Sequence, residues 1–214
     1  MIKTLSPKAE SLAENYLHIK VGPFATMAPY YMNILSKRFS KSVWVGKGLP
    51  TEIEAEADKI YRRFKPYFEN SPSQGHSLLV NAGLGIDCSG LVSILLDAHL
   101  QETRGFGITE AIKIRGGIWW LLKRLRPYTS ISANDLTNDL KSVAIGLSEV
   151  EPGDLIRDGR YHVKLVERVE RKNQKQVEIT YIESATKPVY GAQRVMTDGD
   201  KLEFRRLKKL YEKI

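Results

Sequence analysis

Residues 85–96 read GIDCSGLVSILL and contain Cys88, the only cysteine of the chain. The second half of this stretch is apolar on nearly every side, and a helix with that pattern must be enclosed by the rest of the protein. We therefore predict a buried helix that starts beside Cys88 and ends near His99 or Leu100. This helix determines how the remaining elements must pack.

Either Asp87 or Ser89 is suited to be the N-cap of this helix, because a short polar side chain accepts hydrogen bonds from the first backbone N–H groups. The positive end of the helix dipole favours a thiolate at Cys88, which is the nucleophilic form of cysteine. The same N–H groups could stabilise an oxyanion. The alternative is an inert cysteine in the core, which is a common fate of a free thiol. A catalytic role therefore requires a histidine elsewhere.

Composition limits the class of protein. At 214 residues the chain suits one domain, and 42% hydrophobic with 27% charged residues is typical of a soluble globular protein. A net charge of +8 favours anionic partners, but no nucleic-acid motif is present and we expect no nucleic-acid partner. No apolar run approaches a membrane span, and residues 1–20 lack the apolar core of a signal peptide. We expect no integral membrane segment, and either a cytoplasmic protein or one exported by a route that the sequence does not reveal.

The first part of the chain, residues 1–70, is predicted to be a helical N-terminal extension of unknown role. Residues 6–7, Ser-Pro, suit a helix start, and residues 51–54 read as a capping box. Residues 46–48, Gly-Lys-Gly, resemble only a fragment of a phosphate loop, so nucleotide binding is not expected. Residues 70–75 read as a polar linker.

From residue 151 onward the hydrophobic pattern changes to period two, which indicates β-strands. A Pro-Gly-Asp turn at 152–154 starts this region. Helices followed by an antiparallel meander predict an α+β fold. The predicted strands cover residues 155–156, 161–167, 177–183, 193–196 and 202–207.

His162 is the predicted base for Cys88, because it opens a strand after a tight turn and an imidazole titrates near neutrality. Glu183 ends the next predicted strand, and neighbouring antiparallel strands can bring it beside His162 to orient the ring. His99 would lie too far along the Cys88 helix to serve.

Three motifs together resemble the NlpC/P60 cysteine peptidases: DCSGLV at 87–92, PGDLI at 152–156 and HV at 162–163. The resemblance covers roughly residues 75–199. It implies a papain-like fold in which N-terminal helices pack on a small antiparallel sheet or half-barrel, with a catalytic domain over residues 75–214.

By this resemblance Cys88 is the nucleophile, His162 the base and Glu183 the third polar residue, where many members have His, Asn or Gln. Asp87 and Ser89 become candidates for contacting the substrate, and their alternative role is helix capping. The resemblance further implies a substrate of peptidoglycan or muropeptide type, cut at a D-glutamyl–diamino acid bond, and chemistry that requires no metal or cofactor.

The chain departs from the family pattern in two places. Residues 79–85 replace an aromatic-glycine stretch, and an insertion around residues 101–148 contains Trp119 and Trp120. Both changes would reshape a substrate groove. Two rival functions therefore stay open: an amidase or acyltransferase on the same scaffold, and a catalytically inactive module that binds the cell wall or a partner protein.

Overall fold

The computed structural model describes residues 1–31, 39–40, 43–44, 46–65, 72–112, 127–172, 177–187, 191–199 and 201–210. They form helices and antiparallel strand pairs, so the predicted α+β class is confirmed. The longer helices are α1 (Pro7–Leu17), α2 (Pro50–Phe64), α3 (Pro72–Ala82) and α4 (Cys88–Arg104). The strands of the main sheet are β1 (Ile2–Thr4), β6 (Ser142–Ile145), β7 (Leu155–Asp158), β8 (His162–Arg171), β9 (Val177–Ala185), β10 (Gly191–Thr197) and β11 (Glu203–Leu207).

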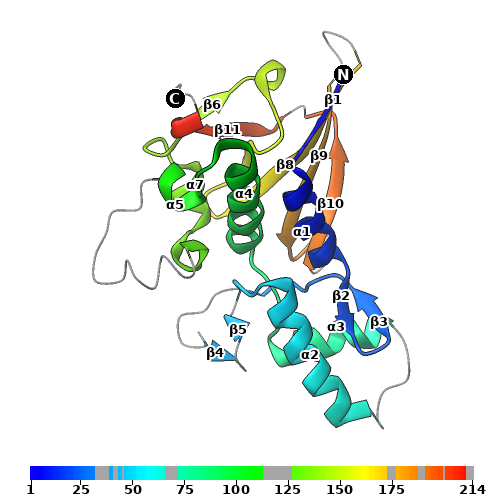
Figure 1. The fold of residues 1–214 in the computed structure, drawn as a ribbon. Coiled ribbons are helices and arrows are strands. Elements are labelled where there is room, and N and C mark those ends of the chain that lie inside the picture. Colours follow the sequence, from blue (N-terminus) through cyan, green and yellow to red (C-terminus); the bar gives the residue numbers. More distant parts are fainter. Residues whose placement is uncertain are drawn as a thin grey trace, which may run out of the picture.

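Strand β8 is the centre of this sheet, which has the order β10-β9-β8-β7-β11-β6 (Figure 1). Strand β9 pairs along one edge of β8. The other edge is shared, since β7 pairs with residues 162–165 and β1 with residues 168–170. The register between β8 and β9 shifts by one residue between Val166 and Arg168, which marks a β-bulge. Strand β1 therefore completes one edge of β8, although the two strands lie far apart in the sequence.

Helix α4 is buried along most of its length and packs against β8 and β9, as its sequence predicts. Asp87 is the N-cap, and its carboxylate accepts a hydrogen bond from the Gly90 N–H. The helix ends at Arg104, one turn beyond the predicted end. Gly105 then takes the left-handed conformation (φ 72°) that commonly terminates helices.

The N-terminal segment contains strands as well as helices, so its description as purely helical is incomplete. Helix α1 packs on α4, and β1 joins the main sheet. Helices α2 and α3 and the hairpin of β2 (Ile19–Val21) and β3 (Phe24–Thr26) form the lower part of the molecule in Figure 1. A short hairpin of β4 (Phe39–Ser40) and β5 (Val43–Trp44) lies beside them.

Two local predictions in this segment are wrong. The N-cap of α2 is Leu49 rather than Thr51, so the helix begins at Pro50, and the Leu49 N–H donates to the Glu52 carboxylate. Proline at the first helical position has no N–H to satisfy, which explains this start. The predicted linker over residues 70–75 already belongs to α3 from Pro72 onward.

The region between α4 and β7 contains short elements in its described part: α5 (Ile108–Ala111), η3 (Pro127–Ser130), α7 (Ala133–Thr137), β6 and η4 (Leu147–Glu149). Trp119 and Trp120 lie outside the described residues. Among the helices that are described, none is long and apolar enough to cross a membrane.

The Pro-Gly-Asp turn lies between α4 and the sheet and contacts both. Gly153 has φ 91°, a conformation that favours glycine, and a Cβ there would lie 2.9 Å from His99 Cδ2. His99 cannot move freely, because its Nδ1 accepts a hydrogen bond from the Ser6 N–H. Asp154 accepts hydrogen bonds from Arg206 Nε and Nη2 of β11, at 2.7 and 2.6 Å.

We predict that Gly153→Ala destabilises the protein by about 2–4 kcal/mol, since left-handed strain adds to the contact with His99. Gly105→Ala is the matched control: Gly105 also has positive φ, but nothing lies within 4 Å of its added Cβ. It should lose only about 1–2 kcal/mol. Urea unfolding of the two variants measures the difference, and equal losses would contradict the contact with His99.

Candidate active site

Cys88 is the first residue of α4 and lies where that helix meets the start of β8. Cys88 is 6% exposed, and its Sγ lies 3.7 Å from the carbonyl oxygen of Tyr161. The first regular helical bond of α4 runs from the Leu91 N–H to the Asp87 carbonyl. The backbone N–H groups of Cys88 and Ser89 therefore precede the helical ladder and lie beside the thiol.

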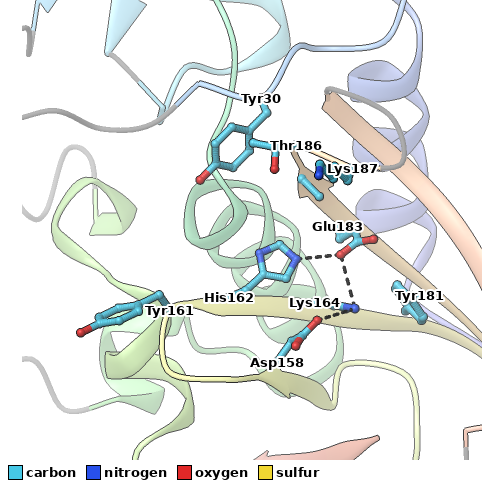
Figure 2. Close-up of a pocket in the computed structure, with 10 residues that line it drawn as sticks. Tyr30, Asp158, Tyr161, His162, Lys164, Tyr181, Glu183, Thr186 and Lys187 are labelled. Carbon is cyan, nitrogen blue, oxygen red and sulfur yellow. Dashed lines mark hydrogen bonds and ion pairs between the residues drawn. The ribbon is translucent and has the colours of Figure 1, made fainter.

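His162 follows the β7–β8 turn and is the first residue of β8. Its Nε2 lies 2.7 Å from Glu183 Oε2 on β9, and Figure 2 marks this contact with a dashed line. A hydrogen bond to the Cys88 side chain also acts on the ring. Because Glu183 engages Nε2, Nδ1 is the ring nitrogen that is left to contact the thiol. The structure thus brings together the three residues predicted as catalytic, from α4, β8 and β9.

The charge state of His162 follows from these neighbours. Burial lowers the pKa of the imidazole, but hydrogen bonding and Coulombic attraction from Cys88 and Glu183 outweigh it and raise the pKa to about 9. At neutral pH the ring is therefore an imidazolium held between two acidic groups.

Glu183 is almost completely enclosed, at 4% exposure, and its two oxygens have different partners. Oε1 accepts a hydrogen bond from Gln193 Nε2 at 3.0 Å, from β10. Oε2 faces both His162 and the ammonium of Lys164, which lies 3.6 Å away. Because both oxygens have partners, the carboxylate has little freedom to turn away from the imidazole.

The sequence did not identify Gln193 or Lys164 as site residues. Lys164 was detectable in principle, since it lies two residues after His162 and alternate residues of a strand share a face. Gln193 gave no comparable signal, because its role depends on the pairing Gln193↔Glu183 between β10 and β9.

Asp87 and Ser89 lie in a buried cluster with Lys47. The Lys47 ammonium donates to Asp87 Oδ1 at 2.9 Å, to Ser89 Oγ at 2.5 Å and to the Ile131 carbonyl at 3.0 Å. The side chain of Lys47 is 3% exposed. Both predicted substrate-contacting side chains are thus engaged within the protein, and Asp87 is also the N-cap.

Lys47 belongs to the Gly-Lys-Gly segment, which crosses the N-terminus of α4. The Asp87 N–H donates to the Gly46 carbonyl at 2.9 Å. A Cβ on Gly90 would lie 2.3 Å from that same carbonyl oxygen, so glycine is required for the close approach. This explains why the DCSG motif ends in glycine.

A pocket of about 550 Å³ opens on the His162 side of the site (Figure 2). Its walls combine aromatic rings with charged groups of both signs. The lining residues are Tyr30, Asp158, Tyr161, His162, Lys164, Tyr181, Glu183, Ala185, Thr186 and Lys187. In the part of the chain that the structure describes, no group of three His, Cys, Asp or Glu side chains is arranged to hold a metal ion.

We predict that the His162 ring titrates in NMR with a midpoint near 9, and that Glu183→Gln lowers this midpoint. The folded pKa lies above the ordinary value of 6.5, so the folded state binds this proton more tightly. The resulting stability is complete below pH 6.5 and is lost as the pH rises through 9. A midpoint near 6.5 in the wild type would contradict the arrangement.

We predict that Lys47→Met destabilises the protein by about 3–5 kcal/mol, because it leaves the Asp87 carboxylate buried without its cation. The double variant Lys47→Met/Asp87→Asn should recover much of this loss, since Asn is also a good N-cap and carries no charge. Denaturant unfolding of the single and double variants measures the coupling. Additive losses would show that the two side chains act independently.

Comparisons of the chain with protein-family models, with curated proteins and with solved structures find no match. The resemblance to NlpC/P60 peptidases therefore rests on the short motifs quoted above. The function has to be inferred from the residues of the site and their geometry.

Proposed function

We propose that the protein is a cysteine peptidase of the NlpC/P60 type with a papain-like arrangement, which hydrolyses a D-glutamyl–diamino acid bond in peptidoglycan stem peptides. The observation that carries this proposal is the contact series Cys88–His162–Glu183, in which a thiol at a helix N-terminus meets an imidazole oriented by a buried carboxylate. Nucleophile, base and orienting group are the three roles that a hydrolytic triad requires.

In the proposed reaction the Cys88 thiolate attacks the amide carbonyl carbon, and a C–S bond forms. The negative charge that develops on the carbonyl oxygen faces the N–H groups of Cys88 and Ser89 at the helix N-terminus. The His162 imidazolium gives its proton to the leaving amine as the C–N bond breaks, which leaves a thioester. The neutral imidazole then takes a proton from water, whose oxygen attacks the thioester and regenerates the thiolate and the imidazolium.

The elevated pKa of His162 suits the first half of this cycle. Below pH 9 the ring carries the proton that the leaving amine needs, and its charge stabilises the thiolate. Activity should therefore fall on the alkaline side as the ring loses its proton. Glu183 keeps the ring oriented through both halves of the cycle.

The wall substrate is supported by the DCSG, PGDLI and HV motifs and by the net charge of +8, which suits an anionic polymer. One observation favours a second candidate, an amidase or acyltransferase with the same catalytic residues. Asp87 and Ser89, which the resemblance assigns to the peptide, are occupied by Lys47. A different acyl substrate, bound through the pocket beside His162, accommodates this difference.

We predict that Cys88 reacts with iodoacetamide at pH 6 about a hundredfold faster than a free thiol, whose pKa is about 8.5. His162→Ala should abolish this low-pH reactivity, because the imidazolium that stabilises the thiolate is gone. His18→Ala is the matched control, since His18 has an exposed ring and is not among the residues that line the pocket. Mass spectrometry of the alkylated protein follows the rate at each pH.

The proposal then requires that the wild type, and not Cys88→Ala, releases new amino groups from purified peptidoglycan. A reactive thiol without such products would favour the second candidate, an enzyme that acts on other amides or on thioesters. A thiol that behaves as a free one, in the wild type as in His162→Ala, would overturn the enzymatic proposal and favour a binding module.

A further inference from the structure

The charged groups of the site form an alternating series that runs from the surface to the nucleophile. The members carry negative, positive, negative, positive and negative charge in turn when the thiol is ionised. Figure 2 shows three of the links as dashed lines. In order, the series is Asp158, Lys164, Glu183, His162 and Cys88.

Lys164 is the link whose presence the triad does not explain. Its side chain is only 10% exposed, although an ammonium loses favourable hydration when it is buried. Its Nζ lies 3.0 Å from Asp158 Oδ2 and 4.9 Å from the centre of the Tyr181 ring. Asp158 and the ring hold the ammonium beside the pocket, where it faces Glu183.

Two cations share one oxygen of Glu183. His162 Nε2 lies 2.7 Å and Lys164 Nζ 3.6 Å from Oε2, while Gln193 occupies Oε1. Because the side chains of Lys164 and Glu183 are 10% and 6% exposed, water screens the charge of Lys164 only in part, and this charge acts on the imidazole as well as on the carboxylate. A like charge this close to a cationic ring favours the neutral form of the ring.

We propose that Lys164 is a positioning residue that anchors Glu183 against His162 and, by sharing the carboxylate charge, limits how strongly Glu183 holds the imidazole in its protonated form. The part of this inference that concerns catalysis rests on the proposed function. The electrostatic part concerns only side chains that the structure describes.

A limit on how strongly His162 holds its proton would suit a hydrolase. A general acid that must also act as a base works best when its pKa lies near the working pH. The Cys88 and Glu183 charges already favour the imidazolium, and a further rise would make the ring a poor proton donor. Lys164 opposes that rise without removing the carboxylate that orients the ring.

The other charged or titratable groups near Lys164 act in defined directions. Asp158 attracts the ammonium from β7, but its side chain is 60% exposed and water screens its effect on His162. The Tyr181 phenol contacts Lys164 from β9, and burial raises the pKa of that phenol, so it is neutral at the working pH. Lys187 lines the pocket as a further cation.

The test measures the titration midpoint of His162 by NMR in a Cys88→Ala background, where no thiol titrates alongside the ring. Adding Lys164→Met should raise the midpoint by about one pH unit relative to this parent. Lys164→Arg should keep the parent's midpoint, because the charge remains. Lys172→Met is the control for net charge, since Lys172 pairs with Glu178 and is not among the residues that line the pocket.

In the active protein, Lys164→Met should lower kcat about tenfold with little change in KM, and its alkaline activity limit should move upward. Lys164→Arg should restore both. An unchanged or lowered His162 midpoint in Lys164→Met would overturn the proposal, even if activity were lost. Because the Cys88→Ala background has no nucleophile, this result does not depend on whether the protein is a peptidase.

Discussion

The buried ion pair between Lys47 and Asp87 fixes the N-terminus of α4, and the geometry of the whole site depends on that position. Each of the three donors of the Lys47 ammonium has an acceptor within the protein. Removing two charges from water costs so much free energy that a buried pair adds little net stability. What the pair contributes is a single allowed arrangement, because either partner left alone would be an uncompensated buried charge.

The proposed nucleophile Cys88 and the proposed base His162 belong to a helix and to the sheet, so their distance depends on how α4 meets the sheet. Ser184, the residue after Glu183 on β9, donates a hydrogen bond to the Ile86 carbonyl at 2.7 Å. Ile86 immediately precedes the N-cap of α4. One hydrogen bond from a side-chain hydroxyl to a backbone carbonyl thus links the strand that carries Glu183 to the turn that precedes Cys88, and both residues of this bond are fully buried. Catalytic groups need such rigid support, since small displacements strongly reduce the rate.

The local patterns of the sequence predicted the elements that carry Cys88, His162 and Glu183. The enclosed apolar run predicted α4, and the period-two pattern with a turn before His162 predicted β8. The pairing of successive strands then suggested Glu183. These predictions succeeded because each depends on short-range periodicity or on neighbouring strands.

Contacts between distant segments could not be predicted in this way. Lys47 reaches Asp87 across 40 residues, and its segment resembled only an incomplete phosphate loop. Gln193 reaches Glu183 through a strand pairing whose register no single strand reveals. The predicted N-cap of α2, Thr51, lies two residues after the observed one, because Pro50 and the backbone of Leu49 fit the helix start better.

The pairing of β1 with β8 joins two segments that are far apart in the sequence. Ile2 pairs with Glu170, so β1 is synthesised well before the strand that completes its hydrogen bonds. Closing so long a loop is entropically costly, and contacts of this kind form slowly. The thiol of Cys88 leaves the ribosome before His162 and Glu183 exist to engage it. During synthesis it is therefore an ordinary cysteine, and it gains its neighbours only when the sheet closes around β8.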